Sequence, residues 1–321
     1  MRELILFLSC RILSPTCAEG RIVAHNNGRA VGILFAVLQA IMYSTMGIFG
    51  KLLNGMGFDS SQVMILRFVS TSVLLGLFMV IWHKEKLVTF SKSVLFQALF
   101  FFLSAWFYFL TVEHLASAGM TTVIFYLFPA VVAIVNVALF GEKFSWTTAL
   151  ALALAIGGTV CVSGALIPGA VTLNALGICF GILSCVSFAI YTILIQRNKH
   201  PEGTFTVTFT IVLLSTLASL VVFVPSLPSL VATSTWQAWA LGAAMALLNT
   251  IAPIVLYIVA IKRIGGTMAS LISISETPFS LFFAFLILGE TLTAWQAAGA
   301  LLIVAGIVLV TAQPLIGRRK G

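Results

Sequence analysis

Ten apolar runs, separated by short polar stretches, follow one another along almost the entire chain. Each run approaches the 20 or so residues that a helix needs to cross the hydrocarbon core of a bilayer. The pattern predicts an all-α integral membrane protein with ten transmembrane helices. The predicted helices lie at 30–53, 62–82, 94–112, 119–139, 147–165, 174–195, 206–224, 237–259, 267–287 and 295–313.

The composition agrees with this pattern. Apolar residues make up 60% of the chain and charged residues only 8%, whereas soluble domains carry roughly a quarter charged residues. So few charges cannot cover a water-facing surface. The five cysteines contain no CxxC pair, and we interpret them as small apolar side chains, so that no disulfide framework, metal site or cofactor is expected.

The basic residues indicate how the chain is oriented. Fifteen of the 17 fall at the ends or in the loops that share one side of the predicted membrane, and the other two, Lys51 and Arg67, lie within apolar runs. Because basic loops stay on the cytoplasmic side, both termini are expected in the cytoplasm, and the net charge of +8 does not indicate nucleic-acid binding. Residues 1–28 are interpreted as a short cytoplasmic extension and 314–321 as a basic cytoplasmic tail of a cell-membrane protein, a bacterial inner-membrane protein by expectation.

The second half of the chain repeats features of the first half in the same order. The matched positions are Gly32 and Gly177, Tyr108 and Tyr257, Pro129 and Pro278, and the Gly-Glu pairs at 141–142 and 289–290. We expect the Gly-Glu pairs to form turns with solvated glutamates. One match could arise by chance, but an ordered set indicates a duplication.

Each copy, at 29–165 and 174–313, contains five predicted crossings. Because five is odd, the second copy must enter the membrane in the opposite sense, which predicts two inverted five-helix repeats. Inverted repeats can expose one site to either side of the membrane in turn, as they do in many secondary transporters.

Three short motifs resemble a known family. Lys51 closes the first run, Arg67 lies early in the second run, and Leu-Gly-Glu at 288–290 closes the ninth. With these motifs, the chain from about residue 29 to residue 313 resembles the EamA-type carriers of the drug/metabolite transporter superfamily. Their ninth segment usually contains Glu-Pro, whereas this chain has Glu-Thr-Pro at 276–278. The resemblance implies a ten-helix carrier, often an exporter of amino acids or other small metabolites, and it does not identify a substrate.

Polar residues inside the apolar runs are candidates for a substrate cavity, because an unpaired polar group is costly in the membrane. Several of them align at helical spacings of three or four residues. The candidate substrate-binding residues are Tyr43, Trp106, Tyr108, Tyr126, Tyr191, Asn249, Tyr257, Ser273 and Glu276. They include all five tyrosines of the chain. Helix packing through small polar residues is the alternative, and we prefer it for serines such as Ser184.

Pro129, Pro253 and Pro278 are candidate helix breaks. A proline lacks the N–H that would bond the carbonyl four residues earlier. Pro129 and Pro278 should therefore leave the carbonyls of Phe125 and Ile274 as free acceptors. Such carbonyls could bind a substrate ammonium group or meet a neighbouring hydroxyl, and proline used only for packing is the alternative.

Three charged residues inside the runs receive separate interpretations. Glu276 lies roughly 14 Å from either end of its run by helical rise, where a charged side chain costs on the order of 3 kcal/mol. We expect Glu276 to bind a substrate ammonium group or to carry a proton; a structural hydrogen bond to Asn136 or a tyrosine is the alternative. Lys51 and Arg67 are candidates for charge pairing or gating, with extension of the side chain to the headgroups as the alternative.

A secondary carrier explains these features better than other membrane functions. An intramembrane enzyme acting on a lipid or peptide is the alternative, but it needs a nucleophile with its base, an aspartate pair or a metal cluster, and the sequence offers no catalytic candidate. A channel filter loop and a nucleotide-binding P-loop are also missing. The expected partners are a small-molecule substrate and membrane lipid; the substrate, the direction of transport, the coupling ion and the oligomeric state are left open.

Overall fold

The computed structural model describes residues 23–83, 86–115, 118–142, 145–163, 174–198, 203–289 and 291–317. Most of the predicted extension at 1–28 and of the predicted tail at 314–321, and Glu290 of the second Gly-Glu pair, lie outside these residues. Helices and short turns account for the described residues.

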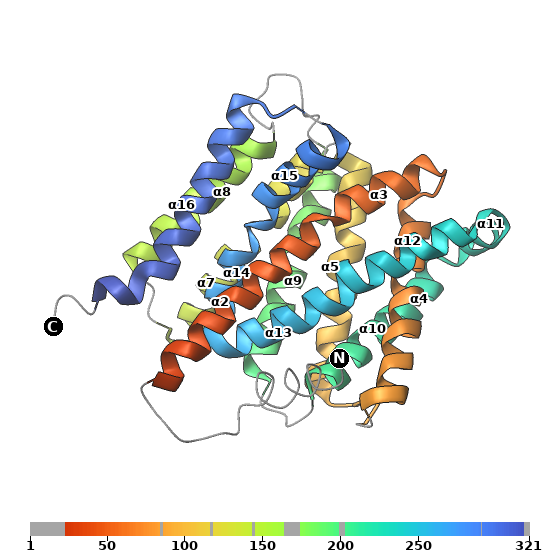
Figure 1. Ribbon diagram of the computed structural model, residues 1–321, viewed down its shortest axis with the longest axis horizontal. Helices are drawn as coiled ribbons and strands as arrows, with labels where there is room; N and C mark the ends of the chain where they lie inside the picture. Colours follow the sequence, from red (N-terminus) through yellow and green to blue (C-terminus); the bar gives the residue numbers. More distant parts are fainter. Residues whose placement is uncertain are drawn as a thin grey trace.

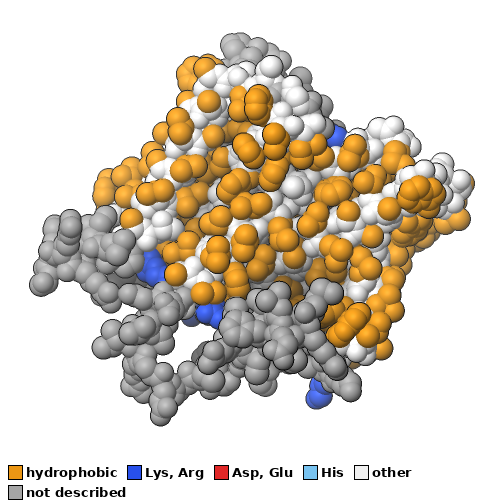
Figure 2. Space-filling model, viewed as in Figure 1, with side chains coloured by type: hydrophobic (Ala, Val, Ile, Leu, Met, Phe, Trp, Pro, Cys, Tyr) orange, Lys and Arg blue, Asp and Glu red, His pale blue; other side chains and the backbone are white. Residues whose placement is uncertain are grey.

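The ten predicted helices are confirmed within a few residues. The spans are Gly28–Gly55, Ser60–Trp82, Lys92–Leu115, Met120–Phe140, Trp146–Ser163, Ala175–Arg197, Thr204–Val222, Trp236–Ile264, Gly266–Ile287 and Ala294–Ala312. Large hydrophobic side chains such as Leu139, Trp146 and Leu301 are exposed. Figure 2 shows hydrophobic side chains spread over the described helices with few lysines or arginines among them, which is the surface expected toward lipid.

Several spans consist of more than one helical element (Figure 1). The elements of the first repeat are α2 (Val23–Ser44), α3 (Met46–Gly55), α4 (Ser60–Phe78), the π-helical η2 (Met79–His83), α5 (Lys92–Leu115), α6 (Ala118–Phe125), α7 (Phe128–Phe140) and α8 (Trp146–Ser163). Those of the second repeat are α9 (Ala175–Arg197), α10 (Thr204–Val222), η3 (Val224–Ser226), α11 (Leu227–Thr233), α12 (Trp236–Ala246), the π-helical η4 (Leu247–Ile251), α13 (Ala252–Ile264), α14 (Gly266–Ser273), α15 (Glu276–Leu288) and α16 (Ala294–Gly317). The short helix α11 was not predicted.

Local sequence explains where key helices begin and end. At the start of α4, the Asp59 carboxylate accepts from the Gln62 backbone N–H, and the Gln62 side chain accepts from the Asp59 N–H, which satisfies two donors at the helix start. Gly141 and Gly289 end α7 and α15 with φ of 64° and 68°, a left-handed conformation that glycine adopts at little cost. The predicted turns at the two Gly-Glu pairs are therefore confirmed at their glycines.

The fourth and ninth spans both break just before their prolines. At the α6/α7 break the Leu127 N–H bonds the Ile124 carbonyl, and at the α14/α15 break the Ser275 N–H bonds the Ile272 carbonyl. Each of these bonds spans three residues instead of four, so the backbone tightens there. The prediction that Pro278 leaves the Ile274 carbonyl free is wrong, because the Thr277 N–H donates to it at 3.0 Å in this tightened turn.

Two closely packed helices, α8 and α16, lie side by side at one edge of the bundle (Figure 1). A Cβ atom added to Gly158 would lie 2.5 Å from the Gly299 carbonyl oxygen, and one added to Gly299 would lie 2.5 Å from the Gly158 carbonyl oxygen. Such close backbone approach requires glycine, as in many transmembrane helix pairs. This edge brings the last helices of the two repeats together.

The broken helices of the two repeats meet at one end only. At the end where α7 finishes and α14 begins, these two helices pack against each other. Beyond the breaks, α6 packs against α5, α8 and α9, whereas α15 packs chiefly against α2, α3 and α16. The fourth and ninth spans therefore touch on one side of their breaks and diverge on the other.

Candidate substrate-binding site

Arg67 lies inside the protein. Its side chain is 5% exposed, its Nε atom donates to Thr250 Oγ1 at 2.8 Å, and its Nη2 atom donates to the Asn249 carbonyl oxygen at 3.0 Å. A third guanidinium nitrogen lies 3.6 Å from Met46 Sδ. These contacts point toward η4 and α3, so the side chain does not extend to the headgroups.

Pro253 explains why the Asn249 carbonyl is available as an acceptor for Arg67. In a regular helix the N–H at position 253 would bond the Asn249 carbonyl, but proline has no N–H. The guanidinium takes over this acceptor within the π-helical segment η4, and π segments inside transmembrane helices are frequent at functional sites. Pro253 and Arg67 thus act together, although they are far apart in the sequence.

Asn249 joins the eighth span to the bend in the first span. The residue is fully buried, and its Nδ2 atom donates to the Met42 carbonyl at 2.7 Å and to Thr45 Oγ1 at 2.9 Å. Thr45 separates α2 from α3. Asn249 Oδ1 has no hydrogen-bond partner among the described residues, so one buried acceptor remains unsatisfied beside the Arg67 contacts.

Glu276 is the first residue of α15, directly after the break in the ninth span. Its carboxyl group interacts with the Tyr126 side chain, which lies at the repeat-related break in the fourth span, and it is within electrostatic reach of Arg67. Asn136 bonds other residues, so of the two structural partners considered for Glu276 only a tyrosine is present. The side chain is half-buried, unlike the almost completely buried segment at 269–275 that precedes it.

The five tyrosines form one group around these two charges. Tyr43 interacts with Arg67, and Tyr108 and Tyr126 interact with Glu276. Tyr257 shares a hydrogen bond of 3.0 Å with Thr192, and Tyr191 lies within electrostatic reach of both Tyr43 and Tyr257. Tyr126, Tyr191 and Tyr257 are buried, while Tyr43 and Tyr108 are half-buried. The sequence prediction of a central tyrosine set therefore describes residues that the fold brings together.

The other predicted residues occupy different places. Ser273 is buried near Tyr257 and donates to Gln39 Oε1 at 3.0 Å. Trp106 packs against Phe102, Phe107 and Phe223, on a part of α5 away from the tyrosines. Lys51 is exposed on α3.

The interpretation of the serines as packing residues agrees with the structure. Ser104 Oγ donates to the Ser184 carbonyl at 3.1 Å, and Ser184 Oγ donates to the Ser104 carbonyl at 2.8 Å. These reciprocal bonds join α5 to α9 and use the only proton that each hydroxyl can donate.

A second polar group, which the sequence did not predict, joins the repeats where α7 packs on α14. We call it the Gln196 cluster; its members are Asn136, Glu142, Gln196, Thr267 and the Gly266 backbone. Gln196 Oε1 accepts from Asn136 Nδ2 at 3.1 Å and from the Gly266 N–H at 3.0 Å. Gln196 Nε2 donates to Glu142 Oε1 at 2.6 Å, and Asn136 Nδ2 also donates to Thr267 Oγ1 at 3.0 Å. The Glu142 side chain is 39% exposed, so its carboxylate is partly solvated as expected, and α9 continues to Arg197 and also brings Gln196, and the Arg197 guanidinium at 3.6 Å, against it.

Ten spans in two repeats, with charged and aromatic groups buried where the repeats meet, define a multi-pass membrane transporter. The model of the EamA-like transporter family matches residues 30–164 and 175–312. The chain belongs to this family, and the predicted membership in the drug/metabolite transporter superfamily is confirmed.

Individual relatives agree with the family. An uncharacterized transporter of Archaeoglobus fulgidus is 27% identical over 275 residues, which cover 85% of this chain and 93% of the relative. An uncharacterized transporter of Synechocystis is 27% identical over 195 residues, covering 60% of this chain and 58% of the relative. A solved structure described only as a crystal structure of a protein shares the fold, with a TM-score of 0.76 and 16% identity, covering 91% of this chain and 99% of that one. The family and the named relatives are transporters, so the chain is a transporter and not an intramembrane enzyme.

Proposed function

We propose that the chain is a secondary carrier that exports amino acids or similar small amphipathic amines across the cell membrane by alternating access. The observation that carries this proposal is the placement of Arg67 and Glu276, one cation and one acid, among five tyrosines between the two repeats. Opposite charges separated by aromatic side chains match a zwitterion with an apolar body.

Both charged groups keep capacity to bind. A guanidinium has five N–H donors, and the acceptors that Arg67 meets are the hydroxyls of Thr250 and Tyr43, one carbonyl and one thioether sulfur. The donor that remains suits a substrate carboxylate. The half-buried Glu276 carboxylate can accept a substrate ammonium beside its contact with Tyr126. Phosphorylated sugars would need more cations at this depth than Arg67 supplies.

The divergence of the broken helices supports alternating access. The fourth and ninth spans touch on the side that the basic residues assign to the cytoplasm and separate on the other side. Discontinuous helices at a repeat interface are a recurring way to build a substrate site near the midplane. When the packed ends of these two spans separate and the separated ends pack together, Arg67 and Glu276 would face the opposite side of the membrane.

Metabolite profiling of cells with and without the protein, followed by transport in vesicles that contain the purified chain, tests this function. We expect an amino acid or a related amine to accumulate inside cells that lack the protein and to cross vesicles that contain it. Vesicles containing Glu276→Gln are the matched control, because this variant keeps the shape of the side chain and removes its charge. Transport of a substrate without an amine, at an equal rate in both vesicle preparations, would refute the proposed site.

A further inference from the structure

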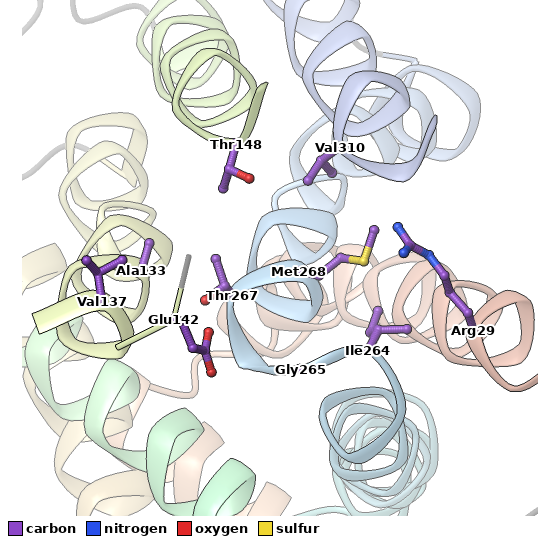
Figure 3. Close-up of a pocket in the computed structure, with 10 residues that line it drawn as sticks. All are labelled: Arg29, Ala133, Val137, Glu142, Thr148, Ile264, Gly265, Thr267, Met268 and Val310. Carbon is purple, nitrogen blue, oxygen red and sulfur yellow. The ribbon is translucent and has the colours of Figure 1, made fainter. Parts of the chain in front are cut away.

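A cavity of about 200 Å³ lies next to the Gln196 cluster, between α2, α7, α14 and α16. It lies on the side where both termini are expected, and it is separate from the central tyrosines. An apolar cavity of about 150 Å³ holds a benzene molecule, so this cavity has room for a compound the size of a small amino acid. Figure 3 shows Arg29 and Glu142 on opposite sides of it.

Two members of the Gln196 cluster form part of the cavity wall. Glu142 and Thr267 line the cavity, and the same side chains bond Gln196 and Asn136. Asn136 is fully buried, and its Oδ1 atom has no hydrogen-bond partner among the described residues. A ligand in the cavity would therefore contact the groups that hold α7, α9 and α14 together.

We propose that this cavity is a loading site for a small zwitterion, whose ammonium group binds Glu142 and whose carboxylate faces Arg29. The inference rests on the proposed carrier function and adds a second binding site to it. An ammonium group bound at Glu142 replaces the Gln196 side chain there and loosens the Gln196 cluster, which opens the packed end of the bundle toward the central site.

The partners of Glu142 can be displaced without leaving a buried charge. The Arg197 side chain is 40% exposed and its guanidinium carbon lies 3.5 Å from the centre of the Phe140 ring, so it keeps water and a cation–π contact when Glu142 is taken. Gln196 is uncharged, and a carboxylate binds an ammonium group more strongly than an amide.

Protection of a cysteine from alkylation measures occupancy of the cavity without any transport. Val137→Cys, which lines the cavity, is placed in a variant whose natural cysteines are replaced by alanine, and its reaction with a maleimide is timed in detergent. The probes are L-2-aminobutyrate, butylammonium and butyrate, which share a carbon chain and differ in charge. We expect L-2-aminobutyrate to protect best, butylammonium to protect less, and butyrate to protect least.

Two substitutions should change this protection in opposite directions. Glu142→Gln removes the ammonium partner and should raise the half-protecting concentration of L-2-aminobutyrate by about tenfold, the effect of losing one contact of about 1.4 kcal/mol. Gln196→Leu removes the competitor for Glu142 and should lower that concentration. If Gln196 only held the structure together, its loss would instead raise the half-protecting concentration. Arg197→Gln, which removes the other partner of Glu142, is the second variant with the same expected direction. Glu113→Gln, exposed at the far end of α5, is the matched control.

The outcomes separate this inference from the carrier function. Failure of every probe to protect Val137→Cys overturns the loading site, even if vesicle transport and its dependence on Glu276 are intact. Strong protection by butyrate that persists in Glu142→Gln also overturns it, because Arg29 would then bind any anion, including a lipid headgroup. Protection as expected in a protein that transports no amine would keep the cavity as a binding site and remove the carrier function.

Discussion

Replacement of Arg67 by lysine tests whether the forked guanidinium holds the eighth span in place. Arg67 reaches two acceptors through two different nitrogens, Thr250 Oγ1 at 2.8 Å and the Asn249 carbonyl at 3.0 Å. A lysine has a single ammonium nitrogen and does not reproduce this planar fork. At least one of the two acceptors in η4 should therefore lose its charged donor.

The loss can be estimated from these two bonds. A hydrogen bond to a charged group contributes about 1.5–3 kcal/mol, and each 1.4 kcal/mol corresponds to about a tenfold change in an equilibrium or a rate. We expect Arg67→Lys to reduce transport at least about tenfold at equal membrane abundance, and to lower the melting temperature of the purified protein.

The matched control for this prediction is Arg263→Lys, near the end of α13. It makes the same chemical change away from η4 and should leave transport unchanged. Equal transport by Arg67→Lys and the unmodified chain would show that the fork is dispensable and that a single positive charge is sufficient.

The remaining predictions concern orientation, packing and the central acid. An alkaline phosphatase fused after Gln313 should be inactive and one inserted at Ser61 active, because the basic loops place these points on opposite sides; the reverse pattern would contradict the proposed orientation. Gly158→Ala should cost about 1–3 kcal/mol of stability, since its Cβ would lie 2.5 Å from a backbone oxygen of α16, whereas a Cβ at Gly157 meets nothing within 4 Å; equal melting temperatures of the two alanine variants would disprove this packing. Glu276→Gln should slow transport and weaken its pH dependence, because the amide cannot exchange a proton, and an unchanged rate and pH profile would show that Glu276 has no functional role.

The helices were predictable because hydrophobic length is a strong signal in membrane proteins. Any backbone within lipid must satisfy its own hydrogen bonds, so each apolar run of sufficient length becomes a helix. The breaks before Pro129 and Pro278 followed from proline chemistry, but the tightened turn that satisfies the Ile274 carbonyl did not. The helix α11 was missed because its seven residues are far too few to cross the membrane.

The central residues were predictable for a related reason. A charged or hydroxyl group inside an apolar run is unusual enough to draw attention without an alignment, and this singled out Arg67, Glu276 and the tyrosines. Trp106 shows the limit of this reasoning. It is two residues from Tyr108, which corresponds to about 200° around a helix, and its aromatic contacts accordingly lie on another part of α5.

The Gln196 cluster escaped prediction because its members lie at segment ends. The predicted sixth helix ended at residue 195, so Gln196 was assigned to a basic loop, where a polar residue is ordinary. Asn136 was considered only as an alternative hydrogen-bond partner for Glu276. Their contact depends on how the end of α9 meets α7 and α14, which is information about tertiary structure.

The Gln196 cluster also makes the two ends of the helical bundle unequal. Two identical inverted repeats would give the states closed at either end the same energy, apart from differences between the two membrane faces. The spacing that relates Pro129 to Pro278 relates Asn136 to Phe285, and the spacing that relates Gly32 to Gly177 relates Lys51 to Gln196. Phe285 and Lys51 are both exposed, so the amide pair has no amide counterpart at the other end.

This inequality has an energetic consequence. Four hydrogen bonds join the members of the Gln196 cluster, and at about 1 kcal/mol each they favour the conformation closed at this end by a few kcal/mol. A ligand shifts such an equilibrium only by its difference in affinity for the two states. In the proposed loading step, a substrate that takes Glu142 from Gln196 would supply that difference at the packed end, whereas a substrate at the central tyrosines alone contacts none of the four bonds. Under the proposed alternating-access cycle, the divergence between the repeats, more than their similarity, would therefore determine which end opens in response to substrate.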